Sequence, residues 1–356
     1  MAIGLVLLAA AGPASSTRVG ISKMHFVNKQ IIFMLFCLPT ILFFSMIPKK
    51  LLQLLCLLGL IATIGMLVLV PFLGEAVKGA KRWINLPGFS LQPSEFLKPF
   101  YSFLIGYVIG SKEWENNRDQ IRTFATCVLL HLVVVLLLLL QPDFGMLMTI
   151  SVVTGVQIFA AGFAWYILAT SIVAIVICGA GAYILLPHVA RRIHLFLNND
   201  GEVAYQVQKS ILSYKAGGMF GRGPGEGVIK YQLPDSHSDF IFAVGGEEFG
   251  AIFCLITIGL ILFIVARGFL HALKTNNKQA VLVMLAMISY MAFQSIFNIG
   301  VTLNMLPTKG MTLPLISYGG SGLISLSIAM GIYLNYSRLS YKSLIREKKY
   351  EVHIKF

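Results

Sequence analysis

Apolar residues are gathered into long runs along this chain, and short polar segments separate the runs. A helix needs about 20 apolar residues to cross roughly 30 Å of hydrocarbon. The stretch 144–186 is too long for one crossing, and Gly162 is the expected turn. No strand-like alternation competes with the helical pattern. Membrane-spanning helices are predicted at 30–47, 51–73, 96–110, 123–140, 144–161, 164–186, 240–265, 279–303 and 313–334.

The first residues, Met1 to Ala11, are apolar but too few to span a membrane, and they lack the basic segment of a signal peptide. We expect them to be the end of a truncated first transmembrane helix, which brings the predicted total to about ten helices. A peripheral apolar tail is the alternative. The predicted fold class is all-α, a polytopic integral membrane helical bundle forming a single domain over 1–356.

Composition supports this class, because hydrophobic residues make up 57% and charged residues only 12% of the 356 residues. Such values exclude a soluble globular protein. Every cysteine lies inside an apolar run without metal-like spacing, so we expect buried thiols and assign no disulfide. The cysteines are Cys37, Cys56, Cys127, Cys178 and Cys254.

The net charge is +13, and nine of the 28 Lys and Arg residues lie in two long segments, 74–95 and 187–239, that we expect on the outer face. Basic residues normally accumulate on the cytoplasmic side, so those kept outside suggest an anionic partner there. A lipid-linked phosphate fits, since each Lys or Arg near an anionic surface contributes about 1 kcal/mol. Contact between these basic residues and ordinary lipid headgroups is the alternative. Because the charges are scattered along the chain, we exclude a nucleic-acid-binding function. The outer basic residues are Lys78, Lys81, Arg82, Arg191, Arg192, Lys209, Lys215, Arg222 and Lys230.

The two outer segments also carry local structural signals. In the first, Ser94 and Glu95 are expected to cap the helix that follows. In the second, apolar residues from Val203 to Ile211 recur at every fourth position, which suits a helix lying in the membrane interface. The glycine run at 217–227 predicts tight turns or close approach to a ligand. It lacks the strand and helix that flank a nucleotide fingerprint, so no nucleotide site is predicted.

Polar groups interrupt the spans as well. The residues 141–143 (Gln-Pro-Asp) break an apolar stretch, at what we expect to be the outer ends of two helices. Glu247 and Glu248 lie a little over two turns into their helix, where acids usually face the bundle interior. The sequence leaves two roles open for Glu248: a structural role, or the lining of a cavity. The Pro- and Gly-rich hinge 306–321 contains Lys309, a candidate for facing an anion.

The segment from Leu233 to Phe242 is the strongest candidate for chemistry. It places Asp235, His237 and Asp239 at the start of a long apolar run. A carboxylate at such a boundary is costly because hydrocarbon cannot solvate it, and partial burial raises its pKa toward a value suited to a base. Capping of the following helix is the alternative role for Asp239, because Asp is a favoured N-cap.

Several distinctive motifs occur in order along the chain: Lys81-Arg82-Trp83-Ile84, Gln92-Pro93-Ser94-Glu95, Gln141-Pro142-Asp143-Phe144-Gly145, Tyr205-Gln206, the glycine run, Leu233 to Phe242, Glu247-Glu248-Phe249-Gly250 and Leu306 to Ser321. Together they resemble the motifs of the SEDS (shape, elongation, division and sporulation) family of peptidoglycan polymerases. The resemblance runs from about His25 to Tyr336, and the motifs taken together are highly specific. The run from Pro307 to Pro314 is closer to the division member, because the elongation version usually lacks its lysine.

The resemblance implies ten helices with both termini cytoplasmic, a cytoplasmic tail at 337–356 and an active-site loop at 187–239. The family's catalytic aspartate, in the motif His-Thr-Asp-Phe-Ile-Phe, matches Asp239. Ser238 replaces the motif threonine and keeps its hydroxyl, whereas Gly322 drops a hydroxyl from the last motif. The short N-terminus also departs from the family and favours a wrongly chosen start codon.

By the same resemblance, the substrate is lipid II, a disaccharide-peptide on undecaprenyl pyrophosphate. The reaction joins the 4-hydroxyl of its glucosamine to the anomeric carbon of the growing strand and releases undecaprenyl pyrophosphate. Asp239 is expected to act as general base, which is worth about 10²–10⁴-fold, with His237 as the alternative base. A divalent cation (Mg²⁺ or Mn²⁺) bridging Asp239 and the pyrophosphate is compatible with these residues, although no full metal cage is visible. The expected pyrophosphate ligands are Arg82, Lys98, Arg191, Arg192, Lys209 and Lys309, and further substrate contacts are expected from Gln206, His237, Glu248 and Ser317.

The resemblance further implies a class B penicillin-binding transpeptidase and other division proteins as partners, in the bacterial inner membrane at the septum. A lipid II flippase or transporter is the competing class, because buried charges and broken helices mark transporters too. No inverted repeat is visible in the motif order. An elongation-type polymerase and a purely structural division scaffold are the remaining alternatives.

Overall fold

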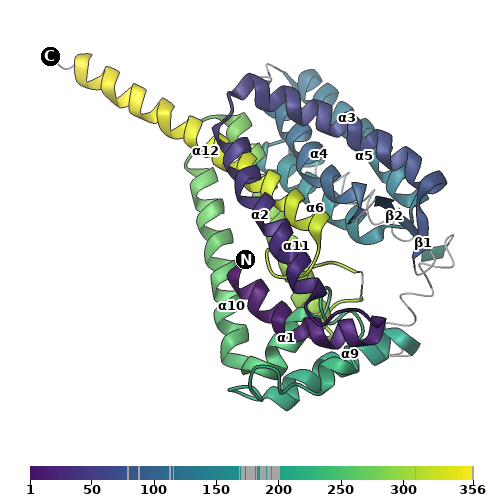
Figure 1. The fold of residues 1–356 in the computed structure, drawn as a ribbon. Coiled ribbons are helices and arrows are strands. Elements are labelled where there is room, and N and C mark those ends of the chain that lie inside the picture. The colour runs from purple at the N-terminus through teal and green to yellow at the C-terminus, as the bar shows by residue number, and fades with distance from the viewer. Residues whose placement is uncertain are drawn as a thin grey trace. The chain divides into compact units, whose positions relative to one another are not determined.

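The computed structural model describes residues 1–77, 80–86, 89–111, 114, 116–167, 201–308 and 310–354, together with isolated positions between 169 and 194. The predicted span 164–186 lies mostly outside these residues. The protein is an all-α polytopic membrane protein, as predicted, and Figure 1 labels its elements. Within the described residues, five helices are long and apolar enough to cross a membrane: His25–Met46, Lys49–Leu73, Asn117–Leu140, Ile241–Leu273 and Lys278–Thr302. Phe144–Ala160 is a shorter apolar helix.

The chain divides into two compact units. Unit 1 comprises Met1–Met34, Phe163–Leu262 and Phe293–Gly319, and unit 2 comprises Leu35–Gly162, Phe263–Ala292 and Gly320–Phe356. The helices α2 (His25–Met46), α10 (Ile241–Leu273) and α11 (Lys278–Thr302) contribute residues to both units.

Unit 1 is built from helices of very different lengths around one apolar core. Besides its parts of α2, α10 and α11, it contains α1 (Ala2–Val19), α9 (Gly201–Gly217) and the 3-10 turn η1 (Ile229–Tyr231). The core joins Leu7 and Leu8 of α1 to the start of α10, where Phe242 and Val244 are fully buried. The chain that leads into α10 is therefore packed inside the unit.

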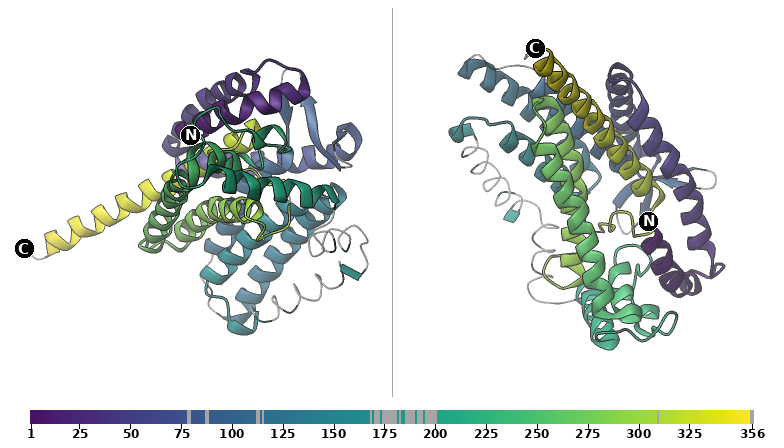
Figure 2. Two further views of the ribbon diagram at one scale, coloured as in Figure 1. Left: turned by 90° about the horizontal axis from the view of Figure 1, so that it is seen from below. Right: turned by 90° about the vertical axis from the view of Figure 1, so that its left-hand side faces the viewer.

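The helix α10 has a break in its backbone at Gly250, which has φ 81° and ψ −179°. The loop that follows α9 lies against this break. It forms hydrogen bonds with the backbone groups of α10 that the break leaves without helical partners. The carbonyl of Glu247 accepts the Arg222 N–H at 3.0 Å, and Ala251 N–H donates to the Gly218 carbonyl at 2.9 Å. The glycine run therefore makes tight turns, as predicted, and its close approach is to the chain's own helix. Figure 2 follows α10 through its full length.

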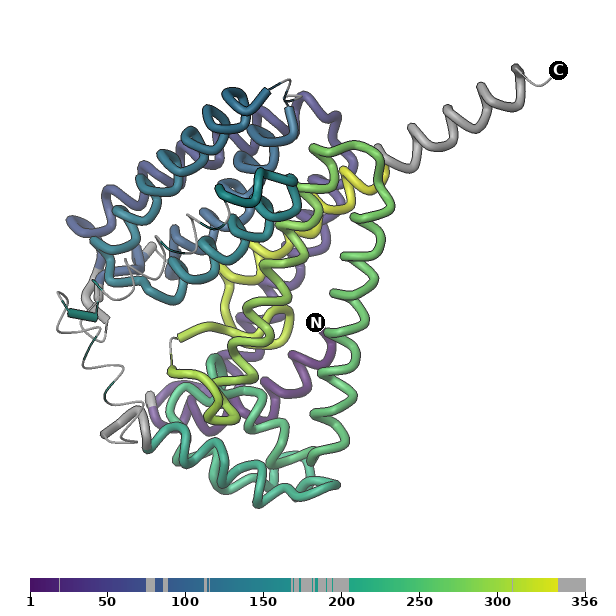
Figure 3. Tube along the Cα trace, turned by 180° about the vertical axis from the view of Figure 1, so that it is seen from behind, coloured from purple at the N-terminus to yellow at the C-terminus, as the bar shows by residue number. Residues whose placement is uncertain are grey.

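Unit 2 is a bundle of helices with α4 (Pro93–Gly110) at its centre. This helix contacts α3 (Lys49–Leu73), α5 (Asn117–Leu140), α6 (Phe144–Ala160) and α12 (Gly320–Ile354), and Figure 3 shows α3 to α6 side by side. Because neighbours cover α4 on several sides, Lys98 and Pro99 are buried inside the unit. That position explains how a predicted span can hold a lysine and a proline.

The segment before α4, which we expect on the outer face, contains three short strands that the hydrophobic pattern did not predict. They are β1 (Glu75–Val77), β2 (Ala80–Leu86) and β3 (Phe89–Leu91), in an antiparallel sheet of order β1-β2-β3. The β2–β3 register pairs Ile84 with Leu91. Two strands have only three residues each, which is too few for a period-two pattern to be read from sequence.

At most of the predicted breaks, the residues found there explain why a helix begins or ends. Gly162 adopts φ 75° directly after α6, which confirms the predicted turn. The prediction that Ser94 and Glu95 cap α4 was wrong, because Gln92 is the N-cap and Pro93 begins the helix. The last helix begins at Gly320 and not at 313, since Leu315 has φ 64° and interrupts helical backbone before it.

We expect the substitution Gly221→Ala to destabilise unit 1. Gly221 has φ 84°, and an added Cβ would overlap the backbone carbonyl of Glu248. Backbone strain of this kind costs about 1–3 kcal/mol, so the thermal midpoint of the detergent-solubilised protein should fall by several degrees. Gly259→Ala, at an open position in the interior of α10, is the matched control and should not lower the midpoint, because alanine favours a helix more than glycine does. An equal effect of the two substitutions would contradict the close packing of this loop.

Candidate functional site

The segment around Asp239 forms a compact turn just before α10. Asp235 has φ 51°, and its carbonyl accepts the N–H groups of Ser238 at 3.1 Å and Phe240 at 3.3 Å. Leu233 and Phe240 are buried at the two ends of this turn, whereas Asp239 is half-buried. The fold thus holds the ends of the segment inside the protein and leaves the carboxylate residue partly accessible.

Three consecutive carbonyls of this turn are held by residues from the last part of α11 and the loop after it. Tyr318 N–H donates to the His237 carbonyl at 3.1 Å, and the Ser317 hydroxyl donates to the Ser238 carbonyl at 2.6 Å. The Asn298 side-chain amide donates to the Asp239 carbonyl at 2.8 Å. Each carbonyl has its own donor, so the backbone that carries the candidate base is fixed residue by residue.

The hinge after α11 lies directly beside the Asp239 carboxylate. The Asn298 amide also donates to the Met311 carbonyl at 2.6 Å, which ties the hinge to the same residue that holds Asp239. A Cβ built on Gly310 would lie 3.6 Å from Asp239 Oδ2. The structure therefore brings together Asp239 and the predicted substrate residue Ser317, whereas Lys309 lies outside the described residues.

His237 packs in a cluster with two aromatic rings, which also contact each other. Its ring stacks on Phe26 at a centroid distance of 4.3 Å and is tilted against Tyr318 at 5.5 Å. His237 Nδ1 and the Ser15 hydroxyl form a hydrogen bond at 2.9 Å. Burial raises the pKa of the Tyr318 phenol above its ordinary value.

The helix α9 carries two of the predicted substrate residues, Gln206 and Lys209. Both are partly exposed, and Lys209 Nζ donates to Gln232 Oε1 at 2.5 Å, next to the Asp239 segment. The face with Val207 and Ser210 is buried, and the Ser210 hydroxyl donates to the Thr302 carbonyl at 2.7 Å. The regular apolar spacing of α9 thus packs Val207 into the protein, where the sequence pattern had suggested membrane contact.

Glu247 and Glu248 occupy a fully buried polar cluster beside η1. Glu248 forms an ion pair with Lys230 through one oxygen and accepts the Gly225 N–H at 3.0 Å through the other. Glu247 accepts three backbone N–H groups, those of residues 228, 229 and 230. In this arrangement Glu248 performs the structural role, with both carboxylate oxygens bonded inside the protein. Its predicted contact with substrate remains a prediction.

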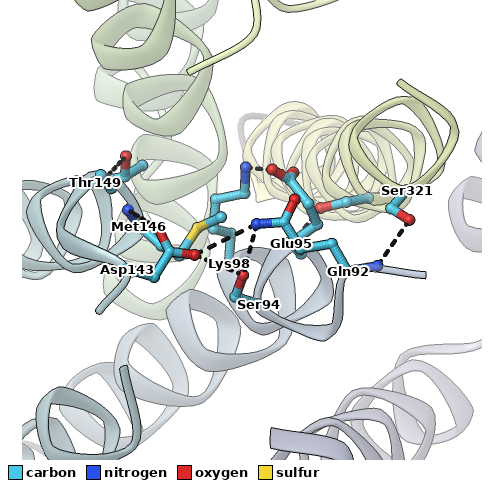
Figure 4. Close-up of polar contacts among 10 residues, drawn as sticks. Gln92, Ser94, Glu95, Lys98, Asp143, Met146, Thr149 and Ser321 are labelled. Carbon is cyan, nitrogen blue, oxygen red and sulfur yellow. Dashed lines mark hydrogen bonds and ion pairs between the residues drawn. The ribbon is translucent and has the colours of Figure 1, made fainter. Parts of the chain in front are cut away.

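Unit 2 holds a second polar cluster, and Figure 4 shows its residues on and next to α4 and α6 together with Ser321 of α12. Asp143 caps α6 by accepting the Met146 N–H at 3.4 Å, and it accepts the Ser94 hydroxyl at 3.1 Å. Arg82 on β2 lies 3.8 Å from Asp143 and also binds the carbonyl of Pro142. The break predicted at 141–143 is therefore a helix start stabilised by charge.

Lys98 lies deeper in the same unit, and its side chain is 1% exposed. Its ammonium pairs with Glu95 at 2.6 Å and lies 4.4 Å from the centre of the Tyr290 ring. The Ser325 hydroxyl of α12 donates to the Glu95 carbonyl at 2.6 Å. Arg82 and Lys98, both predicted to bind pyrophosphate, each have protein partners here.

Among the residues that hold the Asp239 turn, the sequence singled out Ser317, as a substrate contact, but not Asn298 or Ser15. Asn298 offered a signal, because it is a polar residue inside an apolar run, where such residues usually have a defined role. Ser15 offered none. Arg191 and Arg192, predicted as pyrophosphate ligands, lie outside the described residues. Among the described residues, no group of three or more His, Cys, Asp or Glu side chains could hold a metal ion, so no step is assigned to one.

Comparisons with known proteins agree over nearly the whole chain. Residues 1–342 match the family of FtsW, RodA and SpoVE, described as cell cycle protein. A probable peptidoglycan glycosyltransferase FtsW from Caulobacter vibrioides is 35% identical over 336 residues, which cover 93% of this chain and 85% of that protein. One of the same name from Trichlorobacter lovleyi is 38% identical over 283 residues, or 76% of this chain and 72% of that protein.

Solved structures give the same result. A chain from a study of the structural coordination of polymerization and crosslinking by a peptidoglycan synthase complex has a TM-score of 0.75 and 26% identity, covering 95% of this chain and 98% of its own. The rod shape determining protein RodA of Thermus thermophilus has a TM-score of 0.69 and 26% identity, with 96% and 93% covered. With motifs, family match and fold in agreement, this multi-pass membrane protein belongs to the SEDS family, which includes FtsW, RodA and SpoVE.

Proposed function

We propose that this protein is a peptidoglycan glycosyltransferase of the FtsW type, which polymerises lipid II during septal cell-wall synthesis. The family match and the relatives named FtsW support the activity and the division role. The observation that carries the catalytic assignment is the turn at Asp239, in which three successive backbone carbonyls are anchored and the acid itself is half-buried. Such anchoring suits a residue that must meet a substrate hydroxyl in a defined position.

In the proposed reaction, the 4-hydroxyl oxygen of the glucosamine of one lipid II attacks the anomeric carbon of the growing strand. Asp239 accepts the hydroxyl proton as the new C–O bond forms. The bond between the anomeric carbon and the pyrophosphate oxygen breaks, and undecaprenyl pyrophosphate leaves with the electron pair. Because pyrophosphate is a good leaving group, cations that stabilise its charge matter more than a second carboxyl acid.

Lys209 is the described cation of unit 1 that best fits the pyrophosphate. It is partly exposed on α9, and its partner Gln232 immediately precedes Leu233, where the Asp239 segment begins. A neutral amide is a weaker partner for an ammonium group than a phosphate is. We therefore expect Lys209 to exchange Gln232 for the pyrophosphate when the substrate binds. Gln206, His237 and Ser317 are proposed to line the same site, and Glu248 to support it. Arg82, Lys98, Arg191, Arg192 and Lys309 remain proposed ligands.

The proposed partner is a class B penicillin-binding transpeptidase, acting with other division proteins in the inner membrane at the septum. A structural relative was solved in work on a peptidoglycan synthase complex that coordinates polymerization and crosslinking. That likeness supports a partner that performs the crosslinking step.

Replacing the candidate base should abolish polymerisation without unfolding the protein. We expect Asp239→Asn to lower the rate of glycan formation from lipid II by about 10²–10⁴-fold, because it removes the proton acceptor and little volume. The measurement is glycan chain formation by the purified complex with its transpeptidase. Glu226→Gln, which removes an exposed acid in unit 1, is the matched control and should polymerise normally. A rate for Asp239→Asn within threefold of the unmodified protein would refute the assignment.

Removing the cation of α9 should weaken substrate binding more than it slows the chemical step. For Lys209→Gln we expect a rise of about tenfold in KM for lipid II, corresponding to one lost charge-assisted contact. Lys215→Gln, an exposed position later on the same helix, is the control and should keep the original KM. Equal KM values for the two variants would remove Lys209 from the proposed site.

Transport is the second candidate function, because the buried Glu95–Lys98 pair and the break in α10 are features that transporters share. Proteoliposomes carrying fluorescent lipid II separate the two activities. We expect glycan polymer to accumulate when the transpeptidase partner is present. Movement of lipid II between leaflets with no polymer formed would favour the transporter instead.

A further inference from the structure

The N-terminal helix α1 is bonded to the segment that leads to Asp239 at three separate places. The Lys230 ammonium donates to the Ala10 carbonyl at 3.1 Å. The Arg18 guanidinium donates to the Tyr231 carbonyl at 2.7 Å. Further along the segment, the Ser15 hydroxyl contacts Ser236 and His237. The contacts join residues more than 200 positions apart in the chain, and all of them lie within unit 1.

Ser15 has the most specific of these contacts. Its hydroxyl forms hydrogen bonds of 2.9 Å with the Ser236 hydroxyl and 2.9 Å with His237 Nδ1. Ser15 is buried, so these bonds form away from water and no solvent molecule can readily replace them. One small side chain of α1 therefore fixes two neighbouring residues of the segment that ends in Asp239.

The first part of the segment, residues 225–230, is also held by hydrogen bonds and an ion pair. Lys230 is buried, and it bonds to the Gly225 carbonyl and to Glu248 in addition to α1. Glu247 accepts the backbone N–H groups of residues 228 to 230. The chain from 225 to 230 is thus attached to α10 on one side and to α1 on the other. No group in this cluster is assigned a step in the proposed reaction.

From these contacts we infer that α1 positions the candidate base, and that Ser15 is a positioning residue for catalysis. Ser15 acts through His237 and Ser236, whose backbone leads directly to Asp239. Losing its hydroxyl leaves the carbonyl anchors from Asn298, Ser317 and Tyr318 in place, so the turn persists with a less sharply defined position. The inference rests on the proposed function, because the consequence is for the proton transfer assigned to Asp239.

The test compares Ser15→Ala with Thr17→Ala, a control that removes a hydroxyl from the same helix. Thr17 is exposed, and its hydroxyl bonds only to the Pro13 carbonyl of its own helix at 2.8 Å among the contacts described for it. In the purified complex with its transpeptidase, Ser15→Ala should lower kcat for glycan formation about tenfold to hundredfold and leave KM for lipid II within about twofold. Ser15→Thr, which keeps the hydroxyl, should recover most of the rate, and Thr17→Ala should behave as the unmodified protein.

A second readout is independent of enzymatic activity. Hydrogen–deuterium exchange, followed by mass spectrometry, should be faster in peptides covering residues 233–240 of Ser15→Ala and unchanged in those of Thr17→Ala. Faster exchange in a protein that does not polymerise lipid II would uphold the role of α1 and refute the proposed function instead. Unchanged exchange together with an unchanged kcat would overturn the inference. A fall in kcat that Ser15→Thr does not recover would also overturn it.

Discussion

Backbone N–H and C=O groups inside a membrane protein cannot rely on water for hydrogen bonds, so irregular backbone must be satisfied by the protein itself. The described part of unit 1 contains such irregular segments, among them the glycine loop against α10 and the turn before this helix. The break at Gly250 exposes carbonyls and N–H groups of α10, and the glycine loop bonds to them. The turn at 235–240 is satisfied by its own Asp235 carbonyl and by donors from α11 and the following hinge. The position of the candidate site follows from how these groups are paired.

The same constraint governs the charged residues. Each unit buries a lysine against a glutamate, Lys230 with Glu248 in unit 1 and Lys98 with Glu95 in unit 2. Removing water from two charges is costly, and a buried pair contributes to stability only when its remaining hydrogen bonds are also satisfied. Lys230 meets this condition through two backbone carbonyls. The Lys230–Glu248 pair therefore fixes the position of the segment 225–230 more than it adds to the stability of the fold.

In this arrangement, the residues that hold the Asp239 turn differ from the residue that is proposed to take part in the reaction. Ser15, Asn298 and Ser317, which hold the Asp239 turn, are buried, and they contact backbone carbonyls or the side chains of Ser236 and His237. The carboxylate residue is left half-buried, beside the hinge at Gly310. A base held in this way has little freedom to move when the substrate hydroxyl approaches, which favours proton transfer in a defined geometry.

The sequence alone determined the fold class and most of the helix positions, and its motifs named the candidate base through their resemblance to a family. Long apolar runs, the turn at Gly162 and the acid at residue 239 are local patterns, and each can be read within a few helical turns. Tertiary structure decided which residues support the site. Ser15 and Asn298 meet the Asp239 segment from 222 and 59 positions away, and no periodicity encodes such pairings. It also decided that Val207 faces protein and that three short strands precede α4, because burial and strand pairing depend on neighbours that only the folded chain brings together.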